Sequence, residues 1–455
     1  MAWVLRLVDT DVDGQARSFD VIEFTRPDGL GDITNLGLTL DEGKRLLAAV
    51  QQSVVAAQAD SHATLRPDCR SCGRRCHVKD WKPRRIATLF GEVSVPLPRF
   101  LCAGCGRTES GVSWPSYCRS TPELDQLQAR FSALMTFRVA ADVLVHVLPV
   151  DAGKSPETLR GHMLRLGEQL NNASADQPAA AATAITMSLD STFIRSREDG
   201  ERHVEVRVGN VETSSGGRQV FGAVAKTNTD ITALTRRNLQ IVGRTNDTEV
   251  TAFSDGCSGL RSILADAGVT APPILDWFHI AMRLQHTTQA ASGLSTDDPD
   301  RVLAKAVIVA EVERLRWRIW NGKAKNAQRS IERIRKVMHV FQGERGHRTR
   351  RAPSGKLWSA LHEVDRYLSG QGAWLVDYAK RYRAGLRVGT SVTEGTANFL
   401  VNRRMNKSQQ MRWSRRGADL LLQVRCAVYN GTLGSGFGHR FEVFVNPHPM
   451  VSMTA

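Results

Sequence analysis

Two matching cysteine turns constrain the fold of this chain more than any other feature of its sequence. Cys69-Arg-Ser-Cys72-Gly and Cys102-Ala-Gly-Cys105-Gly each aim two thiolates at one point, and the glycine that follows tolerates the positive φ that such turns often require. The alternating residues 85–101 between them predict a hairpin around Phe90-Gly91-Glu92. Two such turns joined by a hairpin predict a zinc ribbon that binds one Zn²⁺ through Cys69, Cys72, Cys102 and Cys105.

Other roles for the cysteines stay open. Disulfides could link the same four residues, although disulfides are rare in cytosolic proteins. Cys76, His77 or Cys118 could also replace one ligand or bind a second ion. Cys257 and Cys426 are isolated, and we expect them to be small buried residues rather than ligands.

The regions on both sides of the ribbon predict further elements. Residues 1–65 indicate a small α/β module, with a capping box from Thr39 to Glu42. Residues 121–172 predict three helices, the last of which begins with Ser155 as N-cap and has an apolar stripe that Arg160 and Arg165 avoid. This pattern is typical of a helix-turn-helix whose last helix enters the major groove of DNA; a plain helical bundle is the alternative.

Beyond a linker-like segment at 173–184, the pattern changes to strands. Strands are predicted at 185–190, 203–212, 218–226, 248–254 and 273–275, with helices at 232–240 and 258–267. Three strands, a helix, a strand, a helix and a strand is the order of an RNase H-like core. Asp190 and Asp255 end the first and fourth strands, which are neighbours in that fold, so we expect the two carboxylates to meet. Two adjacent carboxylates repel each other unless a cation such as Mg²⁺ or Mn²⁺ lies between them.

A third acid is expected from a later helix. Glu394 is our choice, because Glu394, Asn398 and Asn402 share one polar face at helical spacing. Asp276 and His279 follow the fifth strand and are predicted to support the same site. Each residue also fits a plainer role: the aspartates could cap turns or helices, Glu394 could form a capping box with Ser391, and His279 could be a core histidine.

The charge distribution points to a polyanionic partner. The chain has 61 Lys and Arg against 46 Asp and Glu, a net charge of +15. Between residues 301 and 350 there are 14 basic residues and four acids, whereas solvated helix faces usually mix both signs. General basicity from a GC-rich genome is the alternative. A second basic segment follows Glu394, and its members are predicted to bind DNA: Arg403, Arg404, Lys407, Arg412, Arg415 and Arg416.

No apolar run approaches the roughly 20 residues of a membrane helix, and acids occur too early in the chain for a signal peptide. We therefore expect a cytoplasmic, nucleoid-associated protein without a membrane partner. The predicted architecture is multidomain α/β, with an RNase H-like core interrupted by a helical insertion. Its parts are 1–65, a zinc ribbon at 66–120, a helix-turn-helix-like region at 121–172, the linker at 173–184, the core at 185–290, a basic helical insertion at 291–385, the last part of the core at 386–430, and a tail at 431–455.

With these motifs in place, residues 65–430 resemble the DDE transposases of bacterial insertion sequences, in the group related to Mutator-like elements, and most nearly the Kra group. The resemblance depends on the order and spacing of four motifs: Ser188-Leu-Asp190-Ser-Thr, Ser254-Asp255-Gly256-Cys-Ser-Gly-Leu, Asp276-Trp-Phe-His279-Ile, and Glu394-Gly-Thr-Ala-Asn398 with its basic tail. A helical insertion between the second acid and the Glu is also typical of that group, and here 139 positions separate Asp255 from Glu394.

The resemblance implies a function for each part. The ribbon and the helix-turn-helix would recognise the terminal inverted repeats of the element. Asp190, Asp255 and Glu394 would hold Mg²⁺ or Mn²⁺ for cleavage and strand transfer of DNA, and a homo-oligomer would hold two ends together. A nuclease that cannot join strands and a non-catalytic zinc-ribbon regulator of DNA are the two alternatives.

Overall fold

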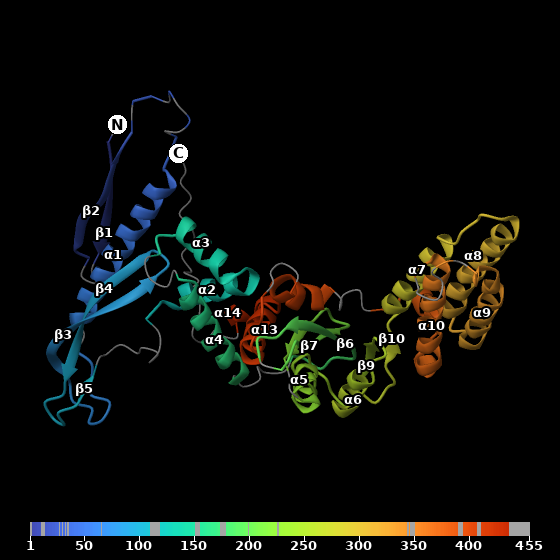
Figure 1. The fold of residues 1–455 in the computed structure, drawn as a ribbon. Coiled ribbons are helices and arrows are strands. Elements are labelled where there is room, and N and C mark those ends of the chain that lie inside the picture. The colour runs from blue at the N-terminus through green and yellow to red at the C-terminus, as the bar shows by residue number, and fades with distance from the viewer. Residues whose placement is uncertain are drawn as a thin grey trace. The chain divides into compact units, whose positions relative to one another are not determined.

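The computed structural model of the chain describes all residues except 1, 11–13, 27, 30, 32, 34–35, 65, 110–118, 151–154, 173–178, 199, 225–226, 344, 346–350, 390–394, 407–410 and 436–455. The chain divides into two compact units: Met1–Leu170 with Gly431–Ala455, and Asn171–Asn430. The protein is a mixed α/β protein with three sheets in its described part (Figure 1). No helix among the described residues is both long enough and apolar enough to span a membrane.

The first unit begins with two sheets and a long helix. Strands β1 (Ala2–Thr10) and β2 (Ala16–Thr25) form an antiparallel hairpin, and α1 (Leu40–Thr64) follows. The predicted capping box is confirmed, because the Glu42 amide donates to Thr39 Oγ1 and the Thr39 amide to Glu42 Oε2. The second sheet has the order β3–β4–β5, with β3 (His77–Thr88), β4 (Gly91–Leu101) and β5 (Thr108–Glu109). Val93, Val95 and Leu97 of β4 pack against Ala59 of α1.

Three helices follow in this unit: α2 (Pro122–Leu134), α3 (Phe137–Val147) and α4 (Pro156–Asn172). They share an apolar cluster around Ala141, Leu144 and Leu159. Ser155 caps α4 as predicted, since its Oγ accepts the Thr158 amide at 3.1 Å. Arg160 and Arg165 are exposed on α4, away from buried Leu159 and Met163. A role in groove recognition stays a prediction.

The second unit is built on a five-stranded sheet with the order β10–β9–β6–β7–β8. Its strands are β6 (Ala184–Arg195), β7 (His203–Thr213), β8 (Arg218–Ala223), β9 (Glu249–Ser254) and β10 (Ile274–Leu275). Strands β10, β9 and β6 are parallel, and β7 and β8 are antiparallel to their neighbours. The strands that lead to Asp190 and Asp255 are neighbours, as the sequence predicts.

Helices cover both faces of this sheet. On one face α5 (Asn228–Ile241) and α6 (Ser258–Asp266) pack against Ile185, Met187 and Leu189 of β6. Residues of the opposite parity face the π-helix η4 (Asn398–Asn406) and α13 (Arg415–Tyr429): Thr192 contacts Asn402, and Gly222 of β8 lies against Leu422. Asp190 has the parity of Thr192, so its side chain lies on the η4 face. The short helix α14 (Thr432–Ser435) follows in the chain and belongs to the first unit.

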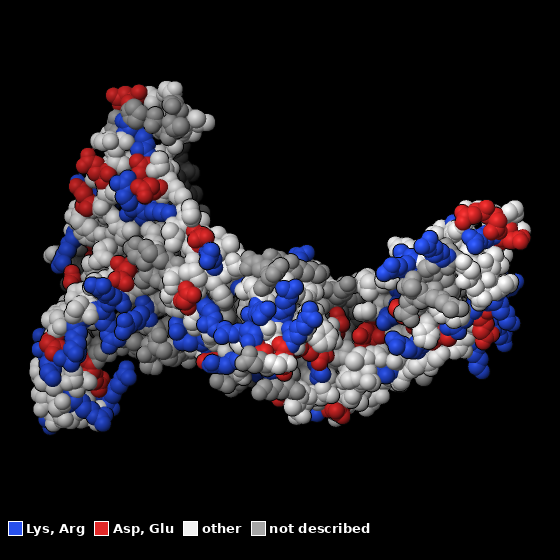
Figure 2. Space-filling view, viewed as in Figure 1, with Lys and Arg blue, Asp and Glu red and all other residues white. Residues whose placement is uncertain are grey.

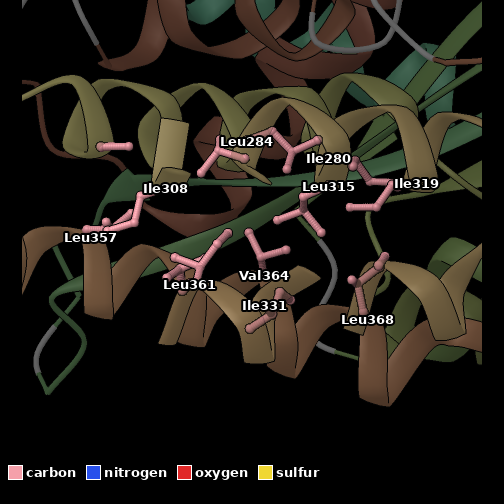
Figure 3. Packing of buried hydrophobic residues seen from close by; sticks show 14 of the residues in the cluster. Ile280, Leu284, Ile308, Leu315, Ile319, Ile331, Leu357, Leu361, Val364 and Leu368 are labelled. Carbon is pink, nitrogen blue, oxygen red and sulfur yellow. The ribbon is translucent and has the colours of Figure 1, made fainter. Parts of the chain in front are cut away.

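A helical bundle lies between β10 and η4 in the sequence. Its helices are α7 (Trp277–Ser292), α8 (Pro299–Trp320), α9 (Ala324–Val337), η2 (Met338–Phe341), α10 (Pro353–Gln371), η3 (Gly372–Trp374) and α11 (Tyr378–Arg383). Figure 3 shows their apolar side chains, among them Leu284, Ile308, Leu315 and Leu361, pointing toward one another. Phe253 and Leu275 join the same core, so the bundle is packed onto the edge of the sheet near Asp255.

Candidate metal centres

The first candidate centre consists of the four predicted cysteines. Their ligand atoms all lie within 4.8 Å of one another. The Sγ atoms of Cys69 and Cys105 are 3.5 Å apart, and those of Cys72 and Cys102 are 3.4 Å apart. A tetrahedral zinc site with bonds of about 2.3 Å separates its sulfurs by about 3.8 Å, so this donor set can hold Zn²⁺. No described cysteine forms a disulfide.

The backbone repeats the same geometry in the two turns. The amides of Gly73 and Gly106 donate to the carbonyls of Cys69 and Cys102, each at 2.9 Å. Gly73 has φ 69° and Gly106 has φ 71°, which L side chains rarely adopt. Amides of Cys105 and Gly104 point at the Cys102 sulfur and, against the effect of burial, lower the pKa of that thiol to about 6. The turns thus favour a thiolate at Cys102, which is the form that binds a metal.

The alternative ligands have different positions. Cys76 is buried beside the cluster but is not one of the four residues; burial, followed by the nearby Cys102 and Cys69 thiolates, raises the pKa of its thiol. His77 is exposed at the start of β3, and Cys118 lies outside the described residues. The prediction that Cys257 is buried is wrong: it is exposed, because it is the N-cap residue of α6, whereas Cys426 is buried.

The second candidate centre lies where β9 and β10 end beside β6. The prediction that Asp190 ends its strand is wrong, because β6 continues to Arg195 and Asp190 pairs with Val208 of β7. Ser188 of β6 pairs with Phe253 of β9, which also pairs with Ile274 of β10. Asp190, Asp255 and Asp276 each lie two residues beyond these positions. The three aspartates therefore occupy corresponding positions along neighbouring strands, which are spaced about 4.8 Å apart.

Asp190 lies within β6 and Asp255 lies in the turn after β9, and both are half-buried. Oδ1 of Asp190 accepts the Ser191 amide, and Oδ1 of Asp255 accepts the Cys257 amide, both at 2.8 Å. These bonds orient the two carboxyl groups. Within the described residues, the four cysteines are the one group of three or more potential ligands close enough to share an ion.

Asp276 is buried and has two roles. Its Oδ1 accepts the Phe278 amide at 2.9 Å, which caps α7, and its Oδ2 lies 3.0 Å from His279 Nδ1. The plainer prediction for Asp276 as a helix cap is therefore confirmed. Burial alone would lower the pKa of His279, but the bond to Asp276 and the charges of Asp276, Asp190 and Asp255 raise it above its ordinary value. The charges of all three aspartates thus act on the pKa of His279.

The third predicted acid, Glu394, lies in the segment 390–394 outside the described residues. The described residues on both sides of that segment approach the aspartates. On one side, a Cβ on Gly389 would lie 2.6 Å from Asp276 Oδ1. On the other side, η4 contacts β6 through Asn402 with Thr192 and through Asn406 with the Phe193 carbonyl. Because Asn402 contacts Thr192 and Asn406 contacts Phe193, η4 runs in the same direction as β6. Its first residue, Asn398, therefore lies at the end of the helix that is nearer Asp190. A π-helix is rare and is often found at functional sites.

The basic segment divides into exposed and buried residues. Arg403, Arg412 and Arg416 are exposed, Arg415 forms an ion pair with Glu201 at 2.9 Å, and Lys407 is not among the described residues. Figure 2 shows Lys and Arg side chains gathered over the part of the second unit that contains α13 and β7. The prediction that Arg404 lies on the surface is wrong. It is 4% exposed with its guanidinium over the Trp413 ring, and burial followed by the charge of Arg425 lowers its pKa to about 10.

The sequence did not reveal which residues surround these acids. Tyr367 and Gln371 of α10 bind the turn after β9, and Arg425 of α13 donates to the carbonyls of Leu400 and Phe399 in η4. Tyr367 and Gln371 have helical i, i+4 spacing, but such a polar pair is equally typical of a solvent-exposed face.

In comparisons with known proteins, no family model matches the chain and no curated protein matches it.

Proposed function

We propose that the chain is a DNA transposase of an insertion sequence, with an RNase H-like catalytic core that cuts and joins DNA by metal-dependent phosphoryl transfer. The observation that carries the proposal is the shared level of Asp190 and Asp255 on adjacent parallel strands. The strand order β10–β9–β6–β7–β8, with β7 and β8 antiparallel to their neighbours, supports it, as does the helical bundle inserted after the second acid.

The residues at this edge suit a divalent cation with oxygen ligands. Two carboxylates on neighbouring strands repel each other, and their oxygens are hard donors of the kind that Mg²⁺ and Mn²⁺ prefer. Asp190 and Asp255 would hold the ions together with Glu394. When bound, such ions activate water and stabilise the charge on a phosphate undergoing substitution.

The protein's own groups would orient the reactants. Asp276 Oδ2 lies 3.0 Å from His279 Nδ1 and would fix the orientation of the imidazole ring beside the phosphates of the bound DNA. Arg403, Arg412 and Arg416 are exposed on or near η4 and α13 and would neutralise backbone phosphates. Asn398 would lie beside Asp190 and support the site.

The first unit would recognise the element ends. The four-cysteine cluster would hold Zn²⁺, and the described strand β3 exposes Lys79, Lys82, Arg84 and Arg85 (Figure 2). Arg160 and Arg165 on α4 would add phosphate or base contacts. Because two element ends must be held at once, we also propose a homo-oligomer.

The test uses the purified chain with labelled duplexes that carry the DNA flanking its gene, plus Mg²⁺ or Mn²⁺. Metal-dependent cleavage at a defined end, followed by joining of the 3′ end to a target duplex, supports the proposal. Asp190→Asn, Asp255→Asn and Glu394→Gln should bind the duplex in a gel shift and not cut it. Cleavage without joined products indicates a nuclease, and binding without cleavage in either metal indicates a regulator.

A further inference from the structure

The helical bundle makes direct contact with the turn that carries Asp255. Tyr367 Oη donates to the Asp255 carbonyl at 2.9 Å, and Gln371 Nε2 donates to the Gly256 carbonyl at 2.8 Å. One face of α10 thus binds two successive carbonyls of a turn that is more than 100 residues away in the sequence. The other face of α10, with Leu361, Val364 and Leu368, is packed in the bundle core.

The turn leaves little room for movement at this contact. Gly256 has φ 93°, a conformation that L side chains rarely adopt. A Cβ at Gly256 would lie 3.2 Å from both the Tyr367 ring and the Gln371 amide carbon. The turn therefore needs glycine for its conformation and for the close approach of α10.

Two arginines hold the contacting side chains in place. Arg261 of α6 donates to Gln371 Oε1, and its guanidinium lies 3.8 Å from the centroid of the Trp374 ring. Arg283 of α7 lies 4.3 Å from the centroid of the Tyr367 ring and donates to the His279 carbonyl at 3.1 Å. Stacked guanidinium groups of this kind stabilise aromatic rings through cation–π attraction. The contact thus connects α6, α7 and α10.

We infer that Tyr367 and Gln371 are positioning residues that set the Asp255 carboxylate for metal binding, an inference that rests on the proposed function. Tyr367 binds the carbonyl of the residue that carries the carboxylate, Asp255. Gln371 binds the Gly256 carbonyl, which belongs to the same peptide group as the Cys257 amide that donates to the Asp255 carboxylate.

The test compares Tyr367→Phe, Gln371→Ala and the double variant with the wild type in the full-length chain. The conservative Tyr367→Phe keeps the ring and removes the hydroxyl. Tyr382→Phe is the matched control, since Tyr382 is in the same bundle but 68% exposed. We would measure the Mn²⁺ concentration for half-maximal cleavage, the maximal rate, Mn²⁺ binding by electron paramagnetic resonance, and the Tm.

Residues that orient metal ligands typically change metal affinity about 10–100-fold, so each single variant should need about 10-fold more Mn²⁺. The maximal rate should recover at saturating Mn²⁺, and the Tm should fall by only about 2–4 °C relative to Tyr382→Phe, the cost of about one lost hydrogen bond. Unchanged Mn²⁺ dependence in an active Tyr367→Phe and Gln371→Ala overturns the inference and leaves the proposed function intact. A wild type that neither cleaves DNA nor binds Mn²⁺ overturns both.

Discussion

Asp190 and Asp255 stand at the same level of two adjacent parallel strands, each two residues beyond the paired Ser188 and Phe253. Side chains in register on parallel strands share one face of a sheet, so the two carboxylates face the same side. On β6 that side is covered by η4 rather than by α5 and α6, and on β9 Phe253 of the same side packs into the core of the helical bundle. The helix that follows the bundle thus returns to the strand that carries Asp190.

Neutralising either acid should affect stability and metal binding in opposite directions. Without metal, Asp190→Asn or Asp255→Asn removes like-charge repulsion, so the Tm should stay the same or rise. Mg²⁺ binding should raise the Tm of the wild type by mass action, and Mg²⁺ should leave the Tm of the two variants unchanged. Cleavage should fall about 10³-fold, because a metal supplies several kcal/mol of transition-state stabilisation. Asp266→Asn, an exposed site at the end of α6, is the control. An equal Mg²⁺ shift in all four proteins would contradict the prediction.

His279 should titrate at a pKa above 6.5 in the metal-free protein. Because the folded state holds the proton more tightly than the unfolded chain, the pair with Asp276 stabilises the fold fully below about pH 6.5. That stability is lost as pH rises through the raised folded pKa. The Tm difference between wild type and His279→Gln should therefore be largest below about pH 6.5, and it should shrink as the pH rises through the folded pKa of His279.

The same histidine should report metal binding. Mg²⁺ at Asp190 and Asp255 would offset two of the charges that raise its pKa. In NMR titrations of the ring protons, the pKa of His279 should fall when Mg²⁺ is added, and Asp190→Asn should lower it without metal. A pKa at or below 6.5 in the metal-free wild type would refute the assignment.

The cysteine cluster should bind one zinc per chain. Cys102→Ser should lose the metal and destabilise the sheet of β3, β4 and β5, since its neighbour Phe100 is packed among Cys69, Cys76 and Cys102. Structural zinc contributes folding energy directly, so a chelator should lower the Tm of the first unit. Cys257→Ser is the control, because that thiol is exposed and distant in sequence. Elemental analysis and thermal melts would check both; equal zinc content in Cys102→Ser would exclude Cys102 as a ligand.

Much of this structure could be predicted from short sequence patterns. Each cysteine turn is specified within five residues, including the glycine with positive φ, so the cluster could be predicted without knowledge of the rest of the chain. The alternation of Ile185, Met187 and Leu189 likewise placed Asp190 on the other face of its strand.

Contacts between distant segments could not be predicted in this way. Tyr367 lies 112 residues from Asp255, and its i, i+4 pair with Gln371 has the pattern of any polar helix face. Arg404 belongs to a run of basic residues that predicts a solvent-exposed surface, yet it is buried, with its guanidinium over the Trp413 ring and a hydrogen bond to Met411 Sδ. Cys257 is exposed because the N-cap position of α6, rather than its own hydrophobicity, determines its environment.

The division of the basic segment into exposed and buried arginines predicts two kinds of defect. Arg412→Ala should weaken DNA binding and reduce the slope of log K against log salt by about 1, while the Tm is unchanged. Arg404→Ala should instead destabilise the fold by about 1–3 kcal/mol, because it removes a buried side chain that lies over Trp413. Salt-dependent binding and thermal melts separate the two. A reduced salt slope with a normal Tm in Arg404→Ala would contradict the buried position.

Two glycines flank the segment that carries Glu394, and they should respond differently to a methyl group. A Cβ on Gly389 would lie 2.6 Å from Asp276 Oδ1 and 3.3 Å from the Phe278 amide, whereas a Cβ on Gly395 would have nothing within 4 Å. Gly389→Ala must therefore displace either the Asp276 cap or the chain that leads to Glu394. Displacement of a catalytic group by about 1 Å can cost about 10²-fold in rate, so Gly389→Ala should lose cleavage to that extent. Gly395→Ala should cut DNA at the wild-type rate, and both variants should bind the duplex equally in a gel shift. If Gly389→Ala were fully active, the close approach to Asp276 would have no bearing on the site, and Glu394 would have to be positioned from the η4 side alone.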